Sequence, residues 1–513
     1  MGLRRSYHAF NAALGSLYEE QLLELSAGTT GPDFDDTAFF DAAGMVYNAG
    51  GFEASQLNTP EARRLIAETL KQLKTAIASG VPHEVPETVR HALENNAFIF
   101  SGFKAFHTLR EVGLSLVTDK GDIKPFETFR RDVEAVNNRY NHNYLYAEYN
   151  HAVGASLMAA RWQKIEADGD RYDLQYRTAQ DDRVREDHAI LHGTTLPPSD
   201  PFWSLYLPPN GWNCRCTAVQ VRKGKYPQSD PALSMLRGNN CTENAKQQIF
   251  RFNPGKELNL FPPKHPYYKA PDDAKKAVEQ LSEEQKREQR IADIIAELPA
   301  SLTADEKKTV AAHCLEIETA LGITKGKPMS VDDADKQHAN PNYGKERGYG
   351  INCQTCSPAY VLRLLGFNVT AKSNTPGTKL EYLSKGNQLW EQWLNLDGTP
   401  AKHTSMNDWL AAHNFQRMTP KRYIKFFEET CKETGVYMLS IGWKRGGGHA
   451  TILQRFADGS LRYIEPQVDN SAGSGRDLDY LSKNGAATMH GCRGIMRVDN
   501  KLFNVAFAEI FDK

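Results

Sequence analysis

The chain has 513 residues, too many for one hydrophobic core of ordinary size, and this length indicates two or three domains. Hydrophobic residues make up 40% of the chain and charged residues 24%, which excludes a disordered tail and a fibre. Lys and Arg number 62 against 63 Asp and Glu, so no global field attracts nucleic acid or an anionic membrane. The composition therefore does not indicate direct DNA binding.

The start of the sequence does not indicate export. Residues 1–5 are basic, but His8 and Asn11 follow without a continuous apolar stretch, so a secretory signal is not expected. No window approaches the roughly 18 apolar residues that a membrane-spanning helix needs. We therefore expect synthesis in the cytoplasm and no membrane partner.

Helical periodicity dominates residues 1–165. Apolar side chains recur every three or four residues over segments 60–79 and 125–162, with charged residues between them. This spacing predicts amphipathic helices that bury one face in a bundle. We therefore interpret residues 1–165 as a helical N-terminal region.

Beyond residue 165 the pattern changes to strands and loops. Residues 172–176 and 217–221 alternate as strands do, and a proline-rich stretch lies between them. These features predict a small strand-and-loop module over residues 166–252.

The segment 253–335 resembles a connector in composition. Residues 253–271 are rich in Pro, Lys and Asn, which predicts an extended linker. Residues 272–321 are dominated by Lys, Glu, Gln and Ala with a broken apolar stripe, which predicts one or two charged surface helices. A turn-rich stretch then introduces the last domain, residues 336–513.

The strand-and-loop module holds a candidate metal site. His188, Cys214 and Cys216 offer three ligands for a tetrahedral zinc, with Asp187 or His192 as the fourth. Structural zinc sites usually place two to four residues between paired cysteines, so the single residue here makes chelation by both sulfurs strained. The alternative is that His188 and its polar neighbours tie the loops together by hydrogen bonds. Four other cysteines are interpreted as buried or idle thiols, namely Cys241, Cys314, Cys431 and Cys492.

A longer stretch around these residues, 144–221, carries a distinctive set of side chains. Its members are Glu148, Arg177, Asp182, His188, Gly193, Pro209 and the Cys214-Arg215-Cys216 triplet. With them, the chain resembles the head morphogenesis proteins of Mu-like phages, which are minor head proteins related to protein F of Mu. The resemblance implies a component of the virion head that associates with portal and capsid proteins, and it implies no catalytic role.

Two cysteines near residue 353 form a candidate nucleophile site. Residues 348–366 predict a glycine-rich approach followed by an apolar helix that ends at a glycine. Cys353 and Cys356 lie near the start of that helix, where partial positive charge and free N–H groups favour a thiolate and can hold an oxyanion. Pro358 leaves the choice open, because a helix that begins at residue 357 would place Cys356 at its N-terminus instead.

A histidine and a carboxylate complete the candidate site. Strands are predicted over residues 436–441, 446–453 and 461–467, with His449 at the glycine-lined start of the second and Glu465 in the third. Adjacent antiparallel strands would bring His449 and Glu465 together. The chain order Cys, His, acid then supplies a nucleophile, a base and an orienting carboxylate.

The C-terminal domain has a recognisable set of segments, which are residues 352–356, 363–371, 447–450 and 463–467. With these segments it resembles the papain-fold toxin domains of bacterial polymorphic toxin systems, some of which are glutamine deamidases. The resemblance implies Cys353 as nucleophile, His449 as base, Glu465 as the third member and Gln467 beside the site. The family more often has Asp where Glu465 stands, and Asp469 is a fallback acid.

Together these features predict a multidomain protein, in which a mainly α N-terminal region with a strand-and-loop module precedes an α+β papain-like domain. The predicted function is a phage minor head protein fused to a cysteine peptidase or glutamine deamidase that acts on a protein substrate. Its location is the bacterial cytoplasm during synthesis and then the virion head. Thiol chemistry requires no cofactor, so a structural zinc is the one candidate cofactor. Two alternatives stay open: a wholly structural head protein with an inactive papain-like domain, and a secreted polymorphic toxin.

Overall fold

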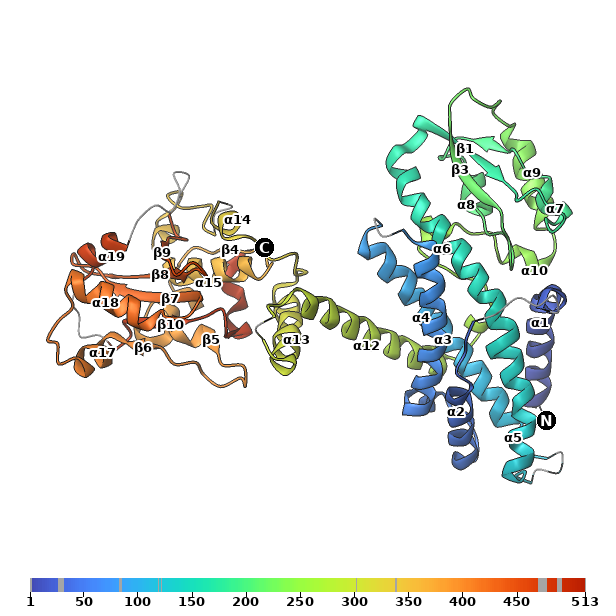
Figure 1. Cartoon of the computed structure of the whole chain (residues 1–513), viewed down its shortest axis with the longest axis horizontal. Coiled ribbons are helices and arrows are strands. Elements are labelled where there is room, and N and C mark those ends of the chain that lie inside the picture. The colour runs from blue at the N-terminus through green and yellow to red at the C-terminus, as the bar shows by residue number, and fades with distance from the viewer. Residues whose placement is uncertain are drawn as a thin grey trace. The chain divides into compact units, whose positions relative to one another are not determined.

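The computed structural model describes residues 2–25, 32–82, 85–118, 120, 122–300, 302–336, 339–468, 478–486 and 491–512 (Figure 1). The chain folds into two compact units, unit 1 being Met1–Arg287 and unit 2 Glu288–Lys513. The predicted charged helices are present as α12 (Asp272–Glu297), which contributes residues to both units, and α13 (Ala304–Leu321). No helix among the described residues is long and apolar enough to cross a lipid bilayer.

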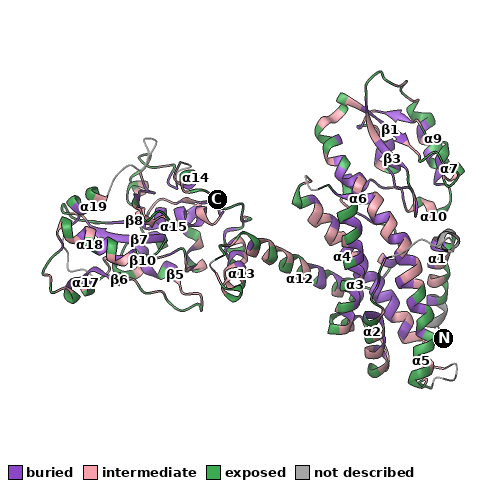
Figure 2. Ribbon diagram, viewed as in Figure 1, coloured by how far each residue is buried: buried purple, intermediate pink, exposed green. Residues whose placement is uncertain are grey.

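Unit 1 is built on a helical bundle. Its helices are α1 (Gly2–Leu25), α2 (Asp36–Ala49), α3 (Pro60–Gly80), α4 (Glu87–Leu114), α5 (Phe126–Asn137) and α6 (Leu145–Asp168), with a 3-10 turn over Ala54–Asn58 and a π-helical turn over Asn138–Tyr144. The predicted helix over residues 60–79 is confirmed as α3, whose first turn is capped by the Thr59 side chain. The buried faces of α3, α4 and α6 meet in one core (Figure 2).

This bundle buries an ion pair between α4 and α6. Lys104 and Glu148 form a salt bridge, with their side chains 1% and 0% exposed. The hydroxyl of Tyr18 in α1 donates to the same carboxylate at 2.8 Å. Burial lowers the pKa of Lys104 and raises that of Glu148, and the attraction between the two groups opposes both changes. The pair therefore ties three helices together while its desolvation works against folding.

The linker predicted over residues 253–271 is not extended. Its side chains Leu260, Phe261 and Tyr267 are fully buried in the bundle core. Phe261 stacks on Phe100 of α4 with ring centroids 3.7 Å apart. The prediction was wrong because two prolines of this segment, Pro254 and Pro266, begin short helical turns, while aromatic residues between and after them fill the core.

The strand-and-loop module follows α6. Its strands form an antiparallel sheet in the order β2 (Thr195–Leu196), β1 (Tyr172–Arg177) and β3 (Thr217–Arg222), which confirms the two predicted strands. Its helices are α7 (Glu186–Ala189), α8 (Phe202–Tyr206), α9 (Pro231–Cys241), α10 (Ala245–Gln248) and α11 (Pro254–Glu257). Trp203, Tyr206 and Cys241 are fully buried in a core of its own.

Unit 2 centres on an antiparallel sheet with the strand order β6-β10-β7-β8-β9. The strands are β6 (Thr404–Ser405), β10 (Gly494–Arg497), β7 (Gly435–Gly442), β8 (Gly448–Arg455) and β9 (Leu461–Ile464). The strands predicted near the C-terminus are present as β7, β8 and β9, but β9 ends at Ile464 and does not include Glu465. Two short pairs, β4 (Thr370–Ala371) with β12 (Phe511–Asp512) and β5 (Trp393–Leu394) with β11 (Leu502–Phe503), lie outside this sheet.

Helices cover both faces of the sheet. They are α14 (Val331–Lys336), α15 (Cys353–Leu364), α16 (Lys379–Leu383), α17 (Met406–Ala412), α18 (Pro420–Thr430) and α19 (Leu478–Asn484). Along β7, Val436 and Met438 share a core with α15, whereas Tyr437 and Leu439 share another with α17, α18 and α19. Alternate residues of a strand point to opposite faces, which explains why every residue of β7 is buried. This layering places α15 beside β8.

Candidate functional site

Cys353 is the first residue of α15 and remains partly exposed. The residue before it, Asn352, is fully buried, and its side-chain amide donates to the Lys372 carbonyl at 2.9 Å. The first N–H groups of a helix have no partner within that helix and carry partial positive charge. The Cys353 thiol therefore lies where backbone groups favour a negative charge.

Pro358 lies inside α15, not before it. A proline cannot donate the backbone hydrogen bond to the carbonyl four residues earlier, which here belongs to Gln354. That carbonyl oxygen instead accepts a hydrogen bond of 3.1 Å from the Nε2 of Gln392. Gln392 therefore replaces the missing donor within a helix that begins at Cys353, and the alternative start at residue 357 is wrong.

Cys356, the alternative nucleophile, points into the core. It is fully buried, and its Sγ lies 3.2 Å from the carbonyl oxygen of Asn352. Burial raises the pKa of its thiol well above the usual range. The surroundings of Cys356 therefore oppose a thiolate, whereas Cys353 is reachable from solvent.

His449, in β8, and Glu465, the residue that follows β9, come together as expected from the sequence. The Nε2 of His449 lies 2.7 Å from the Oε2 of Glu465, and the two side chains are 7% and 4% exposed. Gly446 and Gly447 turn the chain into β8 with φ angles of 92° and 83°, which other residues rarely adopt. The side chain of Glu465 is therefore long enough to reach the imidazole of His449.

Neighbouring groups change the pKa of both His449 and Glu465. Burial lowers the pKa of His449, but hydrogen bonds with Cys353 and Glu465 outweigh it and raise the pKa to about 10. Burial also raises the pKa of Glu465, but the hydrogen bond and charge of His449 outweigh it and lower that pKa below its usual value. Because Nε2 is paired with Glu465, Nδ1 is the nitrogen left to face the thiol. His449 is therefore an imidazolium at neutral pH.

Further hydrogen bonds fix the carboxylate. The Tyr463 hydroxyl donates to Oε2 of Glu465, and the backbone N–H of Gln467 donates to Oε1 at 3.2 Å. The side-chain amide of Gln467 donates to Oδ1 of Asn352 at 3.3 Å. Gln467 therefore links the acid to the residue that precedes Cys353, in agreement with its predicted place beside the site.

An aromatic ring lies beside the imidazole. Trp443 stacks on His449 with ring centroids 5.4 Å apart and planes inclined by 28°. The fallback acid Asp469 lies outside the described residues. Glu465 is the carboxylate that the structure brings to His449.

The ion pair of His449 gives a pH-dependent prediction. In Glu465→Gln, the pKa of His449 is expected to fall from about 10 towards its usual value of about 6.5, since the carboxylate charge is lost. A raised folded-state pKa contributes stability that is complete below about pH 6.5 and is lost as the pH rises through about 10. NMR titration of the His449 ring in both proteins measures this, and a wild-type pKa near 6.5 would contradict the ion pair.

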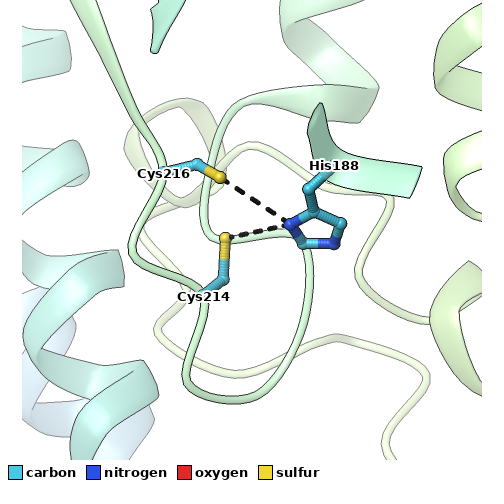
Figure 3. Close-up of side chains that lie close together, drawn as sticks. All are labelled: His188, Cys214 and Cys216. Atoms are coloured by element: carbon cyan, nitrogen blue, oxygen red, sulfur yellow. Dashed lines mark hydrogen bonds between the residues drawn. The ribbon is translucent and has the colours of Figure 1, made fainter. Parts of the chain in front are cut away.

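The candidate metal ligands of unit 1 also come together. Figure 3 shows Cys214 and Cys216 directed at the imidazole of His188, and their Sγ atoms lie 3.6 and 3.7 Å from its Nδ1. Cys241, interpreted from the sequence as solitary, is correctly predicted to be buried but is not isolated, since it lies near His188. Burial lowers the pKa of His188, but hydrogen bonds with Cys214 and Cys241 outweigh it and raise the pKa to about 10.

The two fourth ligands named from the sequence differ in position. The ligand atoms of Asp187, His188 and Cys241 all lie within 4.8 Å of one another. His192 instead pairs its Nδ1 with the Thr178 hydroxyl at 2.9 Å. Sequence reasoning missed Cys241 because it stands 25 residues beyond Cys216, at the end of α9, and only folding brings it close.

Known proteins resemble unit 1. Residues 124–219 match the family model described as Phage Mu protein F like protein. A protein F of Escherichia phage Mu, named for capsid assembly, is 26% identical over 198 residues, which are 38% of this chain and 42% of that protein. The Mu-like prophage FluMu F protein of Haemophilus influenzae is 36% identical over 85 residues, which are 15% of this chain and 20% of that protein. The chain thus spans less than half the length of these relatives.

No solved structure matches the chain. The residues that match the family model, 124–219, extend from the start of α5 into β3 and include His188, Cys214 and Cys216. The N-terminal and middle region of the chain therefore contains a Mu F-like domain.

Proposed function

We propose that the chain is a head morphogenesis protein of a phage or prophage. The support is its Mu F-like domain and the name of its Mu relative, which refers to capsid assembly. Portal and capsid proteins of the head are then its partners, and the chain passes from the bacterial cytoplasm into the virion head. Mass spectrometry of purified virions is expected to find it, and heads that lack it would contradict this role.

We further propose that unit 2 is a cysteine peptidase or glutamine deamidase that acts on protein amides. The observation that carries this proposal is the His449–Glu465 pair at 2.7 Å, with Cys353, at a helix start, near enough to raise the pKa of His449. A nucleophile, a base and an orienting acid in contact are the groups that acyl chemistry needs. The proposal assigns these roles to Cys353, His449 and Glu465.

The reaction follows from the charges of the three groups. The Cys353 thiolate attacks the amide carbonyl carbon, and N–H groups at the start of α15 stabilise the oxyanion. The imidazolium of His449 then gives its Nδ1 proton to the leaving nitrogen, which departs as ammonia or an amine and leaves a thioester. Neutral His449 next takes one proton from water, whose oxygen attacks the thioester carbonyl; the thiolate leaves, and the carboxylic acid formed loses the second proton to solvent. Glu465 keeps the imidazole oriented throughout.

The test uses the purified full chain with the portal and capsid proteins of the same phage. Peptide mass spectrometry is expected to find new termini or deamidated glutamines with the wild type, and neither with Cys353→Ser. Cys492→Ser is the matched control, because it makes the same change at another partly exposed cysteine of unit 2. Products that persist with Cys353→Ser would contradict the thiol mechanism. Products absent even with the wild type would favour an inactive binding domain.

A further inference from the structure

The strand-and-loop module of unit 1 holds a cluster of histidine and cysteine side chains that is separate from the thiol site. We propose that His188, Cys214, Cys216 and Cys241 bind one Zn²⁺ ion there. Three separate segments supply these ligands: α7, the loop before β3, and the last residue of α9. The proposal does not depend on the chemistry of unit 2, and its test is independent of the proposed function.

The spacing of the ligand atoms fits a tetrahedral ion. Bonds of about 2.3 Å to sulfur and about 2.05 Å to nitrogen, at the tetrahedral angle, separate the sulfur and nitrogen atoms by about 3.6 Å. The Sγ atoms of Cys214 and Cys216 lie 3.6 and 3.7 Å from the Nδ1 of His188 (Figure 3). Two edges of the coordination tetrahedron are therefore already formed.

Hydrogen bonding alone does not account for this arrangement. An imidazole nitrogen has either one lone pair or one proton, so Nδ1 of His188 forms one good hydrogen bond. Two thiols are nevertheless directed at that single atom, and one of them, Cys216, is buried. A cation between the three atoms would satisfy both sulfurs and the nitrogen at once, because thiolates and neutral imidazole are the preferred ligands of zinc.

The single residue between the cysteines does not prevent chelation. Arg215 turns away from the cluster and forms a bidentate ion pair with the exposed Asp181, at 2.6 and 2.5 Å. With Arg215 facing outward, Cys214 and Cys216 both face His188. The strain expected from the sequence is therefore avoided by the course of the loop.

Cys241 is the better fourth ligand among the neighbours of His188. It is fully buried, and its Sγ lies within 4.8 Å of the ligand atoms of His188 and Asp187, so His188 is shared between this group and the group that it forms with Cys214 and Cys216. Both oxygens of Asp187 are already engaged, one by the backbone N–H of His188 at 2.9 Å and the other by the Nε2 of Gln247 at 2.9 Å. With three thiolates and one imidazole, the coordination shell has no position for water, which is the pattern of a structural zinc.

A bound zinc ion would cross-link separate segments of the strand-and-loop module. Its ligands join α7, the loop before β3 and the helix α9, which are separate segments of the chain. Zinc affinity becomes folding free energy when the site is formed only in the folded chain. We therefore expect the wild-type chain to lose thermal stability when a strong chelator removes the metal, with unit 1 affected first.

The test measures metal in the purified full chain. Elemental analysis is expected to give about one zinc per chain, and cobalt substitution is expected to give an intense sulfur-to-metal charge-transfer band of a tetrahedral site. The band should weaken by about a third in Cys241→Ala, since one of three thiolates is lost. His192→Gln is the matched control, because this histidine lies in the same module but bonds Thr178.

Each outcome decides a part of the proposal. Wild type without zinc, and without a charge-transfer band after cobalt addition, would overturn the site itself, and this result needs no variant that might misfold. A full band in Cys241→Ala, together with lost metal in Asp187→Asn, would overturn Cys241 as the fourth ligand. Metal lost equally in His192→Gln would overturn the ligand set.

Discussion

Lys104→Met is expected to destabilise unit 1 by about 3–5 kcal/mol. The variant removes the ion-pair partner of Glu148, whose carboxylate is fully buried between α4 and α6. The Tyr18 hydroxyl still donates to that carboxylate but carries no charge. Proteolysis of the full chain in increasing urea, with peptides of the two units read separately by mass spectrometry, measures the change. Unit 2 serves as the internal reference.

The double variant Lys104→Met/Glu148→Leu is the control for this prediction. Replacing both members of a buried ion pair by apolar residues removes the uncompensated charge, so the loss should be much smaller than in the single variant. The Tyr18 hydroxyl keeps a neighbour in the Nε2 of His265 at 3.1 Å. A double variant as unstable as Lys104→Met would show that packing, and not charge, explains the effect.

The second large effect is the difference in reactivity between Cys353 and Cys356. Iodoacetamide at pH 7 is expected to alkylate Cys353 on the order of 100-fold faster or more, because thiolate formation and solvent access both control this reaction. Cys353 is partly exposed at the helix start, whereas Cys356 is fully buried and its thiol pKa is raised. Peptide mass spectrometry over a time course reads the two residues separately.

Cys356→Ala provides the control for this selectivity. The variant keeps Cys353 and its contact with His449, so the rate at Cys353 should stay close to that of the wild type. If Cys356 is labelled first, or if its removal abolishes labelling at Cys353, the assignment of the nucleophile is wrong.

Much of the fold follows from local sequence patterns. The period of the apolar residues over 60–79 identifies α3, and alternation identifies β1 and β3. Composition gave a wrong prediction for residues 253–271, where the abundance of Pro, Lys and Asn suggests a solvated linker. The aromatic rings of this segment are buried only because the bundle leaves space for them, as for Phe261 against Phe100. Such long-range packing has no local signature.

In the candidate sites too, local sequence patterns identify some residues, whereas others are brought together only by folding. Cys353, His449 and Glu465 could be found because each stands at the boundary of an element beside recognisable residues. Two contributors could not be found, since neither has a motif. Gln392 replaces the donor that Pro358 lacks, and Cys241 reaches the His188 cluster from the end of another helix. Both act only through contacts between segments that are distant in the chain.

The most direct test of the thiol site is the pH dependence of Cys353 alkylation in wild type and His449→Ala. The imidazolium of His449 favours reaction of the nearby Cys353 thiol, so wild-type Cys353 should be alkylated faster than the partly exposed Cys492 at each pH, and His449→Ala should lose that advantage. Unchanged alkylation of Cys492 in both proteins provides the reference. If Cys353 reacts as an ordinary thiol in the wild type, or is indifferent to His449, the site is not catalytic.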